Sequence, residues 1–98
     1  MDEAENVEGL QEALASLMSG LQWDVPPRLQ AFMKDMSDNA EYEIALFSLM
    51  NTILEEDVPL APEDAARIAA TAREMGFATG GDALEASMLE RFRKRFPD

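Results

Sequence analysis

The chain has 98 residues, of which 47% are hydrophobic and 29% charged, proportions that favour a folded domain over a disordered chain. It contains no Cys and no His, which excludes disulfides, thiolate metal sites, a Ser-His-Asp triad and the commonest general base. Twenty acidic residues against eight basic ones give a net charge of −12. This charge repels nucleic acid and anionic membranes and attracts basic protein surfaces, although acidity can also serve only to keep a small protein in solution.

The N-terminal segment is acidic and lacks the apolar run of a secretory signal. No stretch of the sequence approaches the roughly 20 apolar residues that a membrane-spanning helix requires. We therefore expect one helical domain over residues 1–98, with residues 1–5 disordered, located in the cytoplasm and not associated with a membrane.

Helix-forming residues and apolar spacings of three and four predict an all-α fold, a small bundle of about five helices. The first two helices are expected over residues 6–19 and 27–36. Asp38, followed three positions later by Glu41, resembles a capping box and predicts the start of a third helix that ends near Glu55.

The third helix is apolar around much of its girth, so we expect it at the centre of the bundle. Pro62 is suited to open the fourth helix, and Gly76 is expected to follow its end, with Phe77 packing back onto the helix. The fifth helix is expected over residues 83–96.

Two acidic clusters flank the third helix. Glu41 and Glu43 stand at its start, and Glu55, Glu56 and Asp57 stand at its end. Neither cluster has an accompanying Gly-rich loop or the spacing of a calcium loop, so we expect no metal, no cofactor and no catalytic residue, and the protein is not expected to be an enzyme. Solvated acids at helix ends are the plain explanation, and a surface that binds a basic partner is the functional one.

Two aromatic residues are candidate anchors for a partner, namely Trp23 and Tyr42. Trp23 can alternatively cap the core. Met33, Met36 and Phe47 can face either the core or a second copy of the chain, so a homodimer stays open. The basic stretch 91–95 is expected to form intramolecular pairs, to complement a helix dipole or to face solvent rather than to bind nucleic acid.

A family resemblance lies between residues 41 and 77, 37 of the 98 residues. Its parts are segments 41–49, 53–60, 62–63 and 73–77, which read EYEIALFSL, ILEEDVPL, PE and REMGF. The order and spacing of these parts resemble the small helical immunity proteins of bacterial polymorphic toxin (contact-dependent inhibition) systems, the MafI-type and CdiI-type group.

The resemblance implies a protein that binds and neutralises one cognate toxin domain, and many such toxins are nucleases with basic, phosphate-binding active sites. The expected contact residues are the acids of the two clusters with the aromatic anchors: Asp38, Glu41, Tyr42, Glu43, Glu55, Glu56, Asp57 and Trp23. Two alternatives remain, an acidic nucleic-acid-mimicking inhibitor of another basic protein and a helical adaptor whose acidity serves only solubility.

Overall fold

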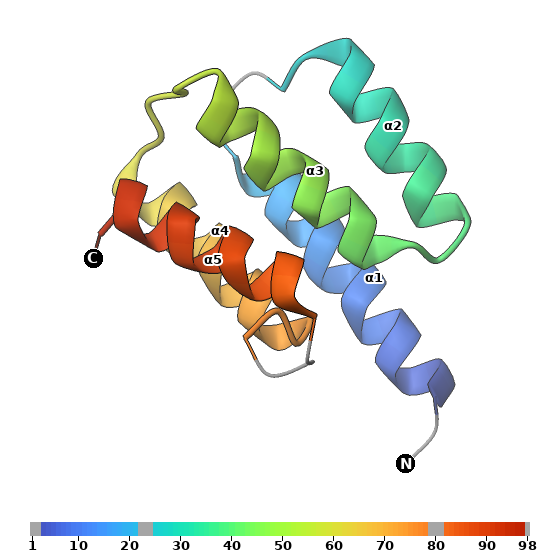
Figure 1. Cartoon of the computed structure of the whole chain (residues 1–98). Coiled ribbons are helices and arrows are strands. Elements are labelled where there is room, and N and C mark those ends of the chain that lie inside the picture. Colours follow the sequence, from blue (N-terminus) through green and yellow to red (C-terminus); the bar gives the residue numbers. More distant parts are fainter. Residues whose placement is uncertain (1–2, 22–24, 79–81, 98) are drawn as a thin grey trace.

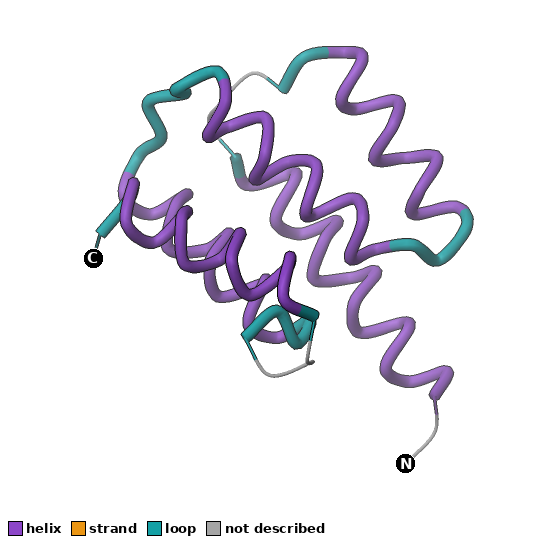
Figure 2. The backbone as a smooth tube through the Cα atoms, viewed as in Figure 1, coloured by secondary structure: helices purple, strands orange, loops and turns teal. Residues whose placement is uncertain are grey.

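The computed structural model describes residues 3–21, 25–78 and 82–97, and these residues contain five helices and no strand (Figures 1 and 2). The predicted all-α, five-helix fold is thereby confirmed. The helices are α1 (Glu3–Gly20), α2 (Pro27–Asp38), α3 (Tyr42–Glu55), α4 (Pro62–Glu74) and α5 (Ala83–Arg95). None of the described helices combines the length and the apolar character needed to cross a membrane.

Helix α3 lies at the centre of the bundle, as its apolar girth predicted. It packs against α1, α2, α4 and α5 (Figure 1). Its fully buried side chains include Leu46, Leu49, Met50 and Ile53. A helix with neighbours on several sides needs apolar residues on more than one face, which explains the broad apolar surface of this segment.

Helices α3 and α5 pack against each other in parallel, so their N-terminal ends lie together and their C-terminal ends lie together (Figure 2). Contacts at both ends define this register. Glu43 of α3 interacts with Glu85 of α5 at the N-terminal end, and Asp57, just beyond α3, pairs with Arg95 at the C-terminal end. The parallel arrangement brings together acidic residues that are some 40 positions apart in the sequence.

The boundary between α2 and α3 differs from the prediction. Asp38 is the last residue of α2 rather than the cap of α3, and Glu41 precedes α3 without a side-chain capping bond. The chain reverses at Ala40, whose φ is 59°, and the amide of Glu41 donates to the carbonyl of Met36 at 2.7 Å. This six-to-one bond defines a Schellman motif, which ends α2 and leaves no position for a capping box.

Helices α3 and α4 end in the same type of motif. The φ angles are 53° at Asp57 and 86° at Gly76. The amides of Val58 and Phe77 donate back to Ile53 and Ala72 at 3.0 Å. The predicted position of Gly76 after the helix end is confirmed, and Phe77 is fully buried in the core.

Helix α1 begins at Glu3, so residues 3–5, which the sequence predicts to be disordered, lie in its first turn, and residues 1–2 are outside the described part. Acidic residues in the first turn of a helix are favourable because the N-terminal end of the helix dipole is positive. Leu14 and Leu17 anchor the C-terminal half of α1 in the core.

Candidate functional site: an acidic groove between helices α3 and α5

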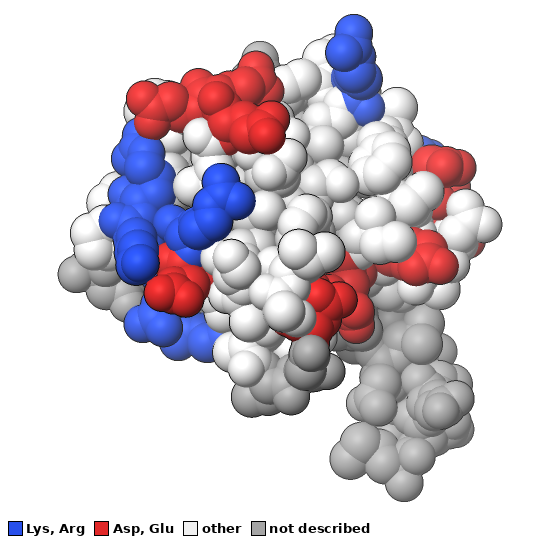
Figure 3. Space-filling view, in the orientation of Figure 1, with Lys and Arg blue, Asp and Glu red and all other residues white. Residues whose placement is uncertain are grey.

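A groove of about 440 Å³ opens where the N-terminal ends of α3 and α5 meet. We call it the acidic groove; the residues that line it are Ala40, Glu41, Tyr42, Glu43, Ile44, Phe47, Asp82, Leu84 and Glu85. Four of them are carboxylates and none is Lys or Arg. In Figure 3 the surface over this region shows a group of acidic side chains at the lower centre of the molecule.

The N-terminus of α5 holds two of the four carboxylates in place. Asp82 is the N-cap, and its Oδ1 accepts hydrogen bonds from the amides of Leu84 at 2.9 Å and Glu85 at 3.2 Å. These bonds satisfy amides that the first turn of a helix leaves without partners. The cap thus sets the direction of α5 and places Glu85, in the first turn, beside α3.

Glu85 has a perturbed acidity. Desolvation, followed by the negative charges of Glu43 and Asp82, raises its pKa from the ordinary 4.5 to about 7. Protonated Glu85 also donates a hydrogen bond to Glu43, which stabilises its neutral form. Glu43 and Asp82 are therefore close enough to Glu85 to repel it, although the positive ends of two helix dipoles face these carboxylates.

Apolar side chains are exposed beside these carboxylates. Ile44 is 45% exposed and Leu84 is 72% exposed, and Phe47, one turn after Glu43 and Ile44, is half-buried against the core. With Phe32 of α2, Ile44 and Leu84 are the large apolar side chains that the described residues leave exposed. An apolar centre with charged groups around it is the arrangement found in protein-binding surfaces.

Tyr42 does not serve as an exposed anchor, and this part of the prediction is corrected. The side chain is only 6% exposed and belongs to the core. As the first residue of α3 it faces inward, because α3 is covered on several sides. The exposed apolar role in this region is taken by Ile44 and Leu84 instead.

The second predicted cluster lies at the opposite end of α3. Glu55, Glu56 and Asp57 are all exposed, and Figure 3 shows acidic side chains at the upper left, where α3 ends. A helix of 14 residues is about 20 Å long, so the two acidic clusters do not form one site. Asp57 is further engaged by Arg95, whose Nη2 lies 2.7 Å from its Oδ1.

The remaining predicted contact residues lie elsewhere. Asp38, at the end of α2, forms an exposed ion pair with Lys34 one turn earlier, with Nζ 3.0 Å from Oδ2. Trp23 is outside the described residues. Of the methionines considered for a second copy, Met33 is buried in the core, whereas Met36 is partly buried against it.

Sequence reasoning missed Ile44 of α3 as an exposed residue of the acidic groove, and it also missed Asp82, Leu84 and Glu85. The last three lie at the N-terminal end of α5, with Asp82 as its N-cap, and only the parallel packing of α5 on α3 brings Asp82 and Glu85 near Glu43. The local signal that was available is the position of Asp82 directly before a helix, which favours an N-cap. That signal places the cap but does not identify the helix beside it.

The acidic groove is not arranged as a metal site, since no group of three or more acidic side chains among the described residues could hold a metal ion. Comparison of the chain with protein-family models, curated proteins and solved structures gives no significant match. The chemistry of the groove is therefore inferred from its own residues: carboxylates crowded around exposed apolar side chains, with no cation lining them.

Proposed function

We propose that this protein binds a basic protein partner in the acidic groove and acts as an immunity protein for a bacterial toxin domain. The observation behind the proposal is the clustering of four carboxylates around exposed Ile44 and Leu84, without a lining cation. The proposal that the partner is a toxin domain rests on the family resemblance of residues 41–77. The proposed role also places the protein in the cytoplasm, where a delivered nuclease-like toxin acts.

A basic partner suits the acidic groove for an electrostatic reason. No Lys or Arg lines the groove, and desolvation and neighbouring carboxylates raise the pKa of Glu85 to about 7. A Lys or Arg inserted between Glu43 and Glu85 would offset their repulsion and favour the ionised form of both. Exposed Leu84 and Ile44 would lose water at the same time, which favours a lasting complex over transient attraction.

Neutralisation follows from the type of surface that would be covered. Nuclease active sites bind phosphate with Lys and Arg, and these side chains are complementary to a row of carboxylates. The bound protein would occupy the phosphate-binding surface or the approach to it, and nucleic acid would be excluded by overlap and by the negative charge of the complex. The net charge of −12 also accelerates association with a basic domain.

The direct test is co-expression with the toxin domain encoded upstream, followed by size-exclusion chromatography of the pair. We expect growth to be rescued and a complex to elute as one species. The double variant Glu43→Lys/Glu85→Lys should abolish both. A toxin that remains lethal, with no complex, would contradict the proposal.

The matched control is Glu55→Lys/Glu56→Lys, which makes the same change of charge at the other end of α3. We expect this variant to retain binding and protection, because these residues lie about 20 Å from the groove. Equal loss in both variants would show that net charge, rather than the acidic groove, determines binding. Binding of a basic protein with a different gene neighbour would instead support the second possibility, an inhibitor of another basic protein.

A further inference from the structure

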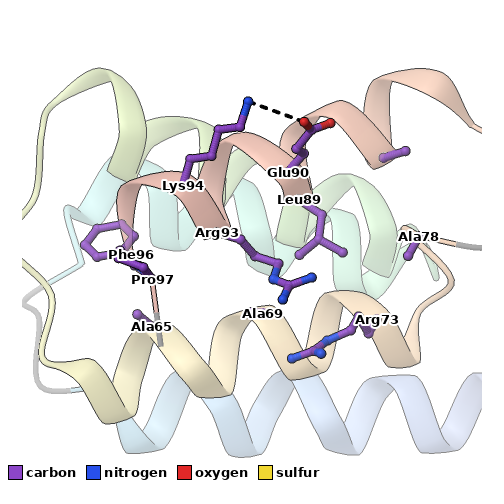
Figure 4. A pocket seen from close by; sticks show the side chains of 11 residues that line it. Ala65, Ala69, Arg73, Ala78, Leu89, Glu90, Arg93, Lys94, Phe96 and Pro97 are labelled. Carbon is purple, nitrogen blue, oxygen red and sulfur yellow. Dashed lines mark ion pairs between the residues drawn. The ribbon is translucent and has the colours of Figure 1, made fainter.

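A second groove lies between α4 and α5, and it is basic, in contrast to the acidic groove. It has a volume of about 470 Å³, and Figure 4 shows the side chains that line it. Arg93 reaches from α5 toward α4, and Arg73 of α4 lies opposite, so their guanidinium groups point toward each other across the groove. We call this the basic groove.

The two guanidinium groups are not neutralised within the described part of the chain. The ion pairs there join Lys34 to Asp38, Lys94 to Glu90, and Arg95 to Asp57, and neither Arg73 nor Arg93 takes part in one. In a protein of net charge −12, two facing cations without an acidic partner are an exception to the prevailing charge. Both side chains are exposed, so water screens part of their repulsion, and an anion between them would offset the rest.

The rest of the basic groove favours a small ligand with an apolar part. Ala65, Ala69 and Leu89 are buried and line the groove beside the two arginines. Glu90 is the one carboxylate among the lining residues, and Lys94 neutralises it, with Nζ 3.4 Å from Oε1. In Figure 4 this pair lies on the side of α5 away from the space between the two helices.

We propose that the basic groove binds a small organic dianion, either a phosphate monoester or a dicarboxylate. Each guanidinium presents a planar set of donors that matches two oxygens of a phosphate or carboxylate. A dianion between Arg73 and Arg93 neutralises both, whereas a monoanion leaves one positive charge. A groove of about 470 Å³ lies in the range of small-molecule sites, and its alanine floor accommodates a short apolar body.

The test is a titration of the full chain that is monitored by the NMR signals of the backbone amides. Sodium chloride keeps the ionic strength constant. The probes are inorganic phosphate, phenyl phosphate and succinate, each up to about 10 mM, which covers dissociation constants of the millimolar range. We expect saturable shifts confined to α4 and α5, and tighter binding of phenyl phosphate than of inorganic phosphate. Saturation by succinate with the same shifts would identify a dicarboxylate site, and saturation by the phosphates alone would identify a phosphate site.

Two variants locate the site and one controls for charge. Arg73→Gln and Arg93→Gln should each weaken binding about tenfold, the effect expected for loss of one charge-assisted contact. Arg91→Gln, an equal change of charge on the same helix but outside the lining of the groove, should leave binding within about twofold. The proposal is overturned if no probe saturates, or if Arg91→Gln weakens binding as much as Arg93→Gln.

Discussion

The two ends of the α3–α5 pair differ in the charges that the packing of the helices brings together. At the N-terminal end, carboxylates of both helices meet, and no cation lines the groove between them. At the C-terminal end, exposed Glu55, Glu56 and Asp57 meet a basic last turn of α5, and Asp57 pairs with Arg95. The N-terminal end therefore holds carboxylates without a lining cation, whereas at the C-terminal end Arg95 pairs with one of three carboxylates.

Helix dipoles explain part of this difference. Acids at the N-terminal ends of α3 and α5 and basic residues at the C-terminal end of α5 are each favourable. Acids at the C-terminal end of α3 are unfavourable, and Arg95 offsets one of them. What dipoles do not explain is the crowding at the N-terminal end, where desolvation and the charge of Glu43 raise the pKa of Glu85. That residual repulsion is not a consequence of helix capping.

The largest change in the free energy of unfolding is expected where the N-terminal end of α3 meets the core. Tyr42→Ala should lower the free energy of unfolding by about 3 kcal/mol, because it removes a large buried side chain and leaves a cavity. Ile44→Ala, two residues away but 45% exposed, should change it by less than about 0.5 kcal/mol. Urea unfolding followed by circular dichroism measures both, and similar losses would contradict the assignment of Tyr42 to the core and Ile44 to the surface.

The second-largest effect is a dependence of stability on pH. Because the pKa of Glu85 is raised from 4.5 to about 7, the folded protein keeps a proton that the unfolded chain releases between these values. This contribution makes the fold less stable as pH rises through the window, and the loss is complete above pH 7. Glu85→Gln should therefore increase stability at pH 8 by about 1.5 kcal/mol, allowing for screening by solvent.

Thermal unfolding of both proteins at pH 5 and pH 8 measures this contribution. The wild type should lose more stability than Glu85→Gln between the two values. Glu90→Gln on the same helix provides the control, since Glu90 is paired with Lys94 and exposed. If Glu85→Gln and wild type show parallel pH dependence, the carboxylates of the acidic groove do not repel one another as described.

The next change in stability is expected on replacing the two residues with positive φ that flank α3. Ala40 and Asp57 both have positive φ, 59° and 53°, a conformation that costs a residue with a Cβ about 1 kcal/mol relative to Gly. Ala40→Gly should therefore stabilise the protein by about 1 kcal/mol. Asp57→Gly should give a smaller gain, because it also removes the ion pair with Arg95. A loss of stability in Ala40→Gly would contradict the helix end described here.

The smallest change in stability is expected at the C-terminal end of the α3–α5 pair. Arg95→Gln removes the exposed pair with Asp57 and the contact of the guanidinium with the Phe96 ring, whose centroid lies 4.8 Å from Cζ. The cost should be about 0.5 kcal/mol and should shrink as salt is added, because exposed ion pairs are weak and screened. A cost that does not respond to salt would assign the effect to packing on Phe96.

Much of the fold could be predicted from the sequence because local rules decide it. Pro62 at the first turn, the apolar girth of α3 and the Gly76–Phe77 helix end all depend on nearby residues, and the structure agrees with each. The start of α3 was misplaced because the Asp38–Glu41 spacing imitates a capping box, whereas Ala40 adopts a left-handed conformation that its side chain does not favour.

The sequence by itself determined the acidic character of the chain, its helices and the presence of carboxylates at both ends of α3. Only the tertiary structure decided which carboxylates act together, because the parallel packing of α5 places Asp82 and Glu85 beside Glu43 and Arg95 beside Asp57. Helix formation depends on spacings of three and four residues. The pairing of helix ends depends on contacts between residues about 40 positions apart, for which no local pattern exists.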